Sequence, residues 1–193
     1  MGQRLNIEIK KQEKLLANAY YHWSAYSEAS LLLTKEIIDK FEEVKEENDI
    51  TQAIMLLQIT GAGLTPSSME YLEEIIPNFE EQKRKYQSAI DRNEGLIEIT
   101  EKGMEKTQYW EEGRITIHID TKTFDFEVFH YPDLEDFEES YEIKIEDLPT
   151  LEFPIKNIKF EQIDKVLELV KKTQETSNGA FKDANGTVYG LIW

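Results

Sequence analysis

The chain has 193 residues, of which 40% are hydrophobic and 32% charged, and its 39 acidic against 22 basic side chains give a formal net charge of −17. This composition excludes a disordered or membrane-embedded chain and is typical of one globular domain over residues 1–193. The lack of cysteine excludes disulfides, thiol nucleophiles and thiolate zinc sites, and the surplus of acid disfavours direct binding to nucleic acid or anionic membrane.

The chain opens with a predicted β-hairpin. Residues 3–9 alternate polar and apolar side chains, which is the period of a half-buried strand, and residues 15–24 form the returning strand after a polar turn near Gln12. This register puts the apolar side chains on one face. The other face then carries Arg4, Asn6, Asn18, Tyr20 and His22.

About three helices follow the hairpin. Apolar residues at helical spacing predict a first helix over residues 25–44, capped by Ser24 or Ser27. A second helix begins at Asp49, whose carboxylate is expected to cap it, and the glycines of residues 60–64 mark its end. A third begins at Thr65-Pro66, and Pro77 breaks it.

The second half is richer in strands. We expect strands at residues 96–100 and 108–110, and a hairpin that pairs residues 114–120 with 123–129, so that His118 lies opposite Asp125. One more helix over residues 160–173 and a terminal strand over 187–193 complete the chain. The sequence therefore predicts an α+β fold, with a mostly antiparallel sheet and helices packed on one face.

The densest group of unusual side chains lies where the returning strand meets the first helix. Free backbone N–H groups at a helix start attract anionic or polar ligands, and aromatic rings beside a cation suit a planar ligand. The alternative interpretation places the tyrosines and the tryptophan in ordinary packing and the histidine on a solvated surface. The predicted ligand-binding residues are Arg4, Asn6, Tyr20, His22, Trp23, Ser24 and Tyr26.

Other patterns favour structural roles. The three histidines His22, His118 and His130 are too scattered for a metal site, and the six acids of residues 133–142 lack the glycine and the alternating oxygens of a calcium loop. We interpret residues 133–142 as a solvated helix. The sequence predicts no catalytic set, no metal and no cofactor.

Several segments carry a resemblance to a known family. They are MGQRLNIEI at residues 1–9, LANAYYHWSAY at 16–26, NEGLI at 93–97 and YWEEGR at 109–114. The chain is similar to a family of small proteins from low-GC Gram-positive bacteria and their phages that carries no assigned activity. The resemblance implies a phage or prophage accessory protein acting in the cytoplasm of a bacterial host cell.

Three functions remain open. The first is a non-catalytic counter-defence protein that sequesters a small nucleotide-like ligand or blocks a host defence protein. The second is an acidic decoy that imitates nucleic acid through residues 42–47 and 133–142. The third is a hydrolase that uses His22 with Ser24 or Tyr26. We expect no membrane partner, and the exposed aromatic residues also suit a homo-oligomer.

Overall fold

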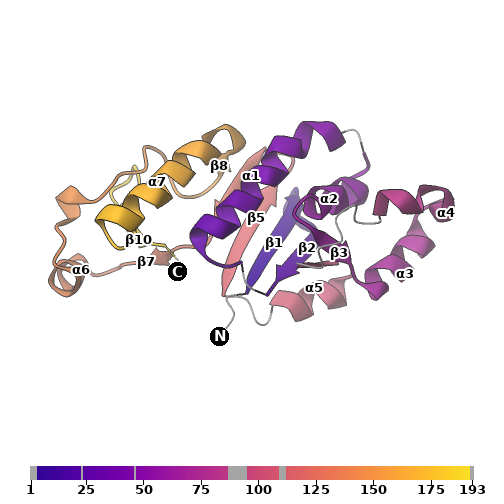
Figure 1. Cartoon of the computed structure of the whole chain (residues 1–193), viewed down its shortest axis with the longest axis horizontal. Helices are drawn as coiled ribbons and strands as arrows, with labels where there is room; N and C mark the ends of the chain where they lie inside the picture. The colour runs from indigo at the N-terminus through magenta and orange to yellow at the C-terminus, as the bar shows by residue number, and fades with distance from the viewer. Residues whose placement is uncertain (1–3, 23, 46, 87–94, 109–111, 192–193) are drawn as a thin grey trace.

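The computed structural model describes residues 4–22, 24–45, 47–86, 95–108 and 112–191, and these form an α+β fold (Figure 1). A seven-stranded sheet has the order β3-β4-β2-β1-β5-β6-β8, and a three-stranded sheet has the order β7-β10-β9. The strands are β1 (Leu5–Lys11), β2 (Lys14–Tyr21), β3 (Ala62–Leu64), β4 (Gly95–Glu98), β5 (Gly113–His118), β6 (Thr123–Phe126), β7 (Phe129–His130), β8 (Ile158–Lys159), β9 (Ala180–Lys182) and β10 (Val188–Gly190). The α-helices are α1 (Ser27–Val44), α2 (Asp49–Gln58), α3 (Pro66–Ile75), α4 (Phe79–Gln82), α5 (Glu101–Gln108), α6 (Leu134–Tyr141) and α7 (Ile163–Thr176).

The N-terminal hairpin is confirmed. Gln12 and Glu13 have φ angles of 49° and 63°, the left-handed pair that a tight hairpin turn requires. Beyond the turn β1 and β2 pair with Asn6 opposite Tyr20 and Leu5 opposite Tyr21. The two faces of the hairpin are therefore those that the alternation predicts.

The inner face of the large sheet is apolar and packs against α1 and α2, and α7 in turn packs against α1 (Figure 1). β1 lies at the centre, antiparallel to β2 on one edge and parallel to β5 on the other. The sheet is thus mixed rather than wholly antiparallel. Buried side chains of this face are Leu5, Ile7, Ile9, Ala17, Ala19, Tyr21, Ile97, Ile115, Ile117, Phe124 and Phe126.

The outer face of the same sheet is polar, and one helix lies against it. α5 packs on this face through Thr107, which accepts a hydrogen bond from the Asn18 side chain. The prediction of a strand over residues 108–110 is therefore wrong for Gln108, which ends α5, while residues 109 and 110 lie outside the described residues. α5 carries one apolar side chain, Met104, which is buried one turn before Thr107, and it lacks the alternating apolar side chains of a strand.

The helix starts differ from those expected. Tyr26, not Ser24 or Ser27, occupies the N-cap of α1 and makes no side-chain capping bond. Asn48 rather than Asp49 caps α2, because its side-chain oxygen accepts a hydrogen bond from the Thr51 amide at 3.1 Å. Thr65 caps α3 and α3 ends at Ile75, as predicted.

The second hairpin of the large sheet has the predicted faces but a different register. Ile117 pairs with Phe124 and His118 with Thr123. The expected register, which put His118 opposite Asp125, is therefore wrong by two residues. The loop is longer than Thr121-Lys122 because the ladder ends at His118 and resumes at Thr123. A shift of two residues keeps the same side chains on the same face.

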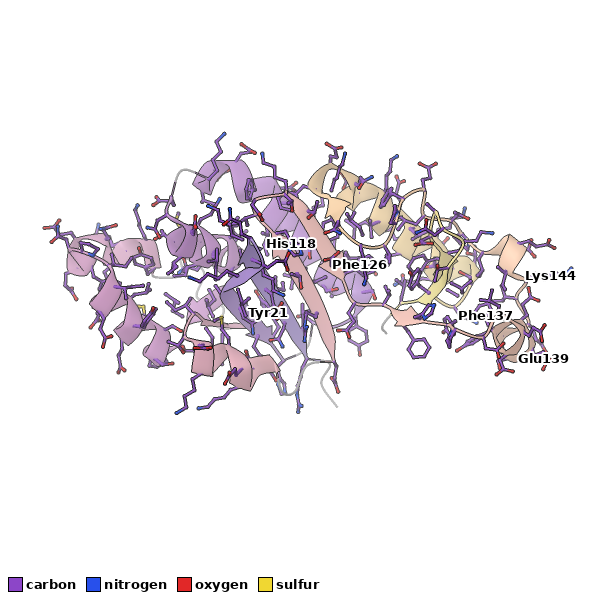
Figure 2. The ribbon with its side chains drawn as sticks, turned by 180° about the vertical axis from the view of Figure 1, so that it is seen from behind. Tyr21, His118, Phe126, Phe137, Glu139 and Lys144 are labelled. Atoms are coloured by element: carbon purple, nitrogen blue, oxygen red, sulfur yellow. The ribbon has the colours of Figure 1, made fainter. Side chains whose placement is uncertain are left out.

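The three-stranded sheet and α6 form a small terminal lobe with its own apolar cluster (Figure 2). Phe137 of α6 packs there with Leu148, Ala180 and Val188. No helix among the described residues is long and apolar enough to cross a membrane.

Candidate binding face

Two predicted site residues, Tyr20 and His22, lie together where β2 ends, next to the start of β1. The ladder closes with Leu5 opposite Tyr21, so Arg4 and His22 are the next residues on the outer face, beside Tyr20. The Tyr20 hydroxyl lies 3.4 Å from His22 Nδ1, and the two rings meet edge to face with centroids 6.5 Å apart. His22 is exposed and Tyr20 is partly exposed.

The neighbouring strands extend this group on both sides. Leu96 of β4 pairs with Tyr20 and is 51% exposed, which is unusual for a leucine within a sheet. Arg114 of β5 pairs with Asn6 on the other side, and its side chain is 40% exposed. The junction face is defined here as Arg4, Tyr20, His22, Leu96 and Arg114.

A buried carboxylate fixes part of this face. Glu8 is 1% exposed although it points to the outer side of the sheet, and its Oε2 lies 3.0 Å from Lys10 Nζ. Arg114 Nε lies 3.8 Å from Glu8 Oε1, and the Thr116 hydroxyl donates to Oε2 at 3.4 Å. These contacts compensate the buried charge and anchor the Arg114 guanidinium over the sheet.

Asn6, a predicted ligand contact, is completely buried. Its side-chain amide donates to the Thr107 carbonyl at 3.1 Å, and its side-chain oxygen accepts from Asn18 Nδ2 at 3.3 Å. Asn6 therefore supports the junction face from beneath α5, and it would contact a ligand only if α5 moved away.

The remaining predicted residues lie along the connection to α1. Ser24 is partly exposed, and Tyr26 is 47% exposed while its carbonyl accepts a hydrogen bond from Ser30 at 2.9 Å. Trp23 lies outside the described residues. The described contacts bring together Tyr20 with His22 and Asn6 with Asn18, whereas none of them joins Ser24 or Tyr26 to either pair.

Sequence reasoning missed Glu8, Leu96 and Arg114. Glu8 was visible as a charge at an outward position of an alternating strand, and its buried charge is compensated by Lys10 of β1 and by Arg114 of the parallel neighbour β5. The position of Leu96 opposite Tyr20 depends on the pairing of β4 with β2, which joins residues far apart in the chain.

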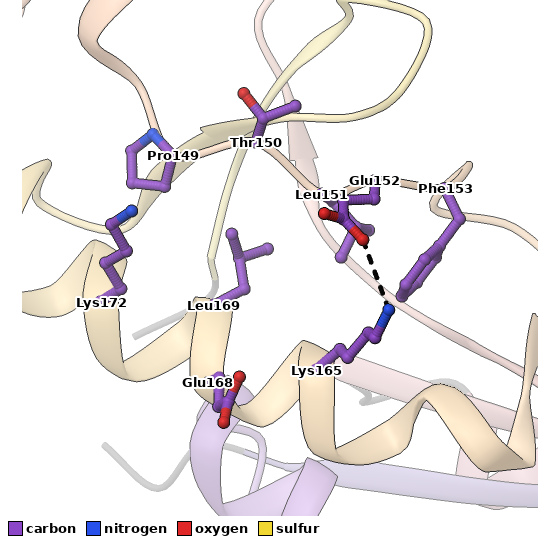
Figure 3. Close-up of a pocket in the computed structure, with 9 residues that line it drawn as sticks. All are labelled: Pro149, Thr150, Leu151, Glu152, Phe153, Lys165, Glu168, Leu169 and Lys172. Atoms are coloured by element: carbon purple, nitrogen blue, oxygen red, sulfur yellow. Dashed lines mark hydrogen bonds and ion pairs between the residues drawn. The ribbon is translucent and has the colours of Figure 1, made fainter.

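The described pockets lie elsewhere. One of about 300 Å³ opens between residues 149–153 and α7, where Lys165 Nζ lies 3.3 Å from Glu152 Oε2 (Figure 3). Another of about 570 Å³ lies between α1 and residues 157–164, with ion pairs of Lys35 and Lys122 at its wall. Neither is lined by the predicted site residues or by the junction face.

Within the described ranges, no group of three or more histidine, aspartate or glutamate side chains is placed to hold a metal ion. Neither a scan against protein-family models nor searches of curated proteins and of solved structures finds a match to this chain.

Proposed function

We propose that this chain is a non-catalytic binding protein that blocks another protein through the junction face. The observation that carries the proposal is the exposed Leu96 beside Tyr20, which contacts His22. The partly exposed Arg114 lies on the far side of Asn6 from Tyr20. Exposed aromatic and arginine side chains are typical of protein interfaces. The described pockets lie away from this face, which favours a protein partner over an enclosed nucleotide-like ligand.

The resemblance of the sequence suggests the setting. A phage or prophage accessory protein acts in the cytoplasm of its bacterial host, so we extend the proposal to a host defence protein as the partner.

The hydrolase function depends on which group orients the His22 imidazole. A hydrolase would need a carboxylate or an equivalent group to orient the imidazole toward a nucleophile. At Nδ1 the described neighbour is the Tyr20 phenol, and the long 3.4 Å contact is a weak constraint.

The contacts of Glu42 and Glu47 weaken the case for an acidic decoy at the first of its two proposed segments. Glu42 bonds Lys45 and Lys122, and Glu47 bonds Lys85, so bases already cover these carboxylates. A decoy for a nucleic-acid-binding protein needs free negative charge along its surface, and Glu42 and Glu47 offer little of it.

The test is capture from a Gram-positive host extract, followed by calorimetry with the purified candidate partner. We expect Leu96→Ser and Arg114→Ala each to weaken binding by about tenfold or more. Leu32→Ser is the matched control, because Leu32 is 47% exposed on α1, away from the junction face. Equal affinity of all three variants would contradict the proposal.

A panel of cyclic and ADP-ribose-type nucleotides separates the two kinds of partner. We expect no heat of binding from the panel. A nucleotide that binds the unmodified chain but not Arg4→Ala would replace the protein partner with a small ligand.

A further inference from the structure

The terminal lobe carries an apolar stripe that remains partly exposed. Leu134, Phe137 and Tyr141 occupy positions i, i+3 and i+7 of α6 and therefore lie on one side of the helix. Phe137 is buried in the lobe and fixes the helix, while Leu134 and Tyr141 on either side of it are 39% and 40% exposed.

Aromatic rings extend this stripe beyond α6. The Tyr131 ring lies 5.6 Å from that of Tyr141 and 5.0 Å from that of Phe129, measured between centroids. Phe129 is 59% exposed on β7, which is an edge strand of the three-stranded sheet. The docking stripe is defined here as Phe129, Tyr131, Leu134 and Tyr141.

Negative charge surrounds the docking stripe. Residues 133–147 contain eight acidic side chains and one base, Lys144. Asp133 and Glu138 accept backbone hydrogen bonds within the lobe, and Lys144 lies 3.7 Å from Glu146. In the part of the chain that the structure describes, no ion pair forms at Glu135, Asp136, Glu139 or Glu142.

We propose that the docking stripe and its acidic surround bind a basic amphipathic helix of a second partner protein. The apolar face of such a helix would cover Leu134 and Tyr141, which lie two turns apart, so about three turns of partner helix suffice. Its lysine and arginine side chains would reach the unpaired carboxylates that flank the stripe. Figure 2 shows Phe137 and Glu139 on α6 at one end of the molecule, where a partner has access.

Two other occupants fit the observations less well. A second copy of the chain would bring eight acids against eight acids, and the repulsion opposes a symmetric dimer through this surface. A nucleic-acid-binding protein whose site contacts only phosphate groups would bind the carboxylates alone. The exposed aromatic rings of the docking stripe would then have no apolar partner. The proposal goes beyond the junction face and does not depend on it.

The probe is a synthetic peptide of about eleven residues, or three turns, with leucine and lysine at amphipathic spacing. A peptide of the same composition with the spacing scrambled is the control for charge alone. Binding is measured by calorimetry at about 50 mM and about 500 mM NaCl, because free charges are screened at the higher salt. The contact surface is mapped by amide chemical shifts in the full chain.

We expect shifts confined to α6 and β7, and binding that is weakened about fivefold or more by Phe129→Ser and by Tyr141→Ser. Leu32→Ser on α1 should bind as the unmodified chain does. Glu135→Lys with Glu139→Lys should weaken binding at low salt and have little effect at high salt. Part of the affinity should survive the higher salt.

Three outcomes would overturn the proposal. The scrambled peptide binds as tightly as the amphipathic one, the shifts map outside the lobe, or the chain forms a dimer that Phe129→Ser dissociates. Tight binding of the scrambled peptide would favour the acidic-decoy function. A dimer that Phe129→Ser dissociates would show that a second copy of the chain covers the docking stripe.

Discussion

The Asn18 side-chain amide donates to the Thr107 hydroxyl at 2.6 Å, and this bond joins the outer face of the sheet to α5. The Thr107 hydroxyl in turn donates to the Met104 carbonyl at 2.9 Å. The Asn6 side-chain amide donates to the Thr107 carbonyl, so this one residue of α5 bonds to both β1 and β2. α5 therefore depends on these polar contacts as well as on Met104, which is its buried apolar residue among those whose side chains the structure describes.

Replacement of Thr107 should destabilise the fold. Thr107→Val removes the acceptor of the Asn18 amide, whose Oδ1 already has no hydrogen-bond partner, and we expect a loss of about 1–3 kcal/mol in the free energy of unfolding. Urea denaturation measures it. Thr176→Val is the matched control, since its hydroxyl bonds Lys172 on an exposed turn, and it should change stability by less than about 0.5 kcal/mol. Similar losses in both variants would count against the role of α5.

Gly103 permits α5 to lie close to Glu98. A Cβ atom at this position would lie within 2.6 Å of Glu98 Cδ and 2.8 Å of the Thr100 hydroxyl. Gly103→Ala should therefore destabilise the protein by about 1–3 kcal/mol, although alanine favours a helix by about 1 kcal/mol. In a Glu98→Ala background the same change should become neutral or stabilising. A loss that persists there would show that Thr100, and not Glu98, sets the limit.

The Glu42 carboxylate should titrate at unusually low pH. Hydrogen bonds from Lys122 and Lys45 lower the pKa of Glu42 to about 2. A lowered pKa stabilises the fold above the ordinary value near 4.5, and this contribution is lost as the pH falls toward 2. Lys122→Met should raise the pKa of Glu42, and side-chain NMR titration measures it. Lys144→Met, with its partner in the terminal lobe, should leave that pKa where it is.

The Tyr131 phenol should ionise at unusually high pH. Burial, followed by the hydrogen bond to Tyr141, raises the pKa of Tyr131 to about 12. Because the folded pKa is raised, its stabilising contribution is complete below pH 10 and is lost as the pH rises toward 12. Tyr141→Phe should lower the pKa of Tyr131 but leave it above 10, since burial remains. Ultraviolet difference absorbance follows the titration, and Tyr71→Phe on α3 is the control.

Local patterns predicted the faces of the large sheet well. Alternation placed Leu5 with Tyr21 and Asn6 with Tyr20, because a side chain's face depends only on its position along the strand. The register of β5 with β6 was missed, because it depends on loop length, which alternation does not encode. α5 was missed because its packing relies on Thr107 rather than on an apolar stripe.

The candidate site was predictable in part. Arg4, Tyr20 and His22 share a face by parity alone, whereas Leu96 and Arg114 join them through pairings that span most of the chain. The expected role of Asn6 depended on its being exposed, and the sequence carried no sign that α5 would cover it. The docking stripe was likewise hidden, because residues 133–142 indicated a solvated helix without showing which rings pack against it.

The parallel pairing of β1 with β5 has a consequence for synthesis on the ribosome. β2 follows β1 directly in the chain, so these two strands can pair as soon as both are translated. Leu5 can pair with Gly113 only after about another hundred residues have been translated. At a translation rate of about 5–20 residues per second, one edge of β1 stays unpaired for about 5–20 s. During that interval nascent chains on a polysome can pair edge to edge, so slowing translation should lower the yield of native protein.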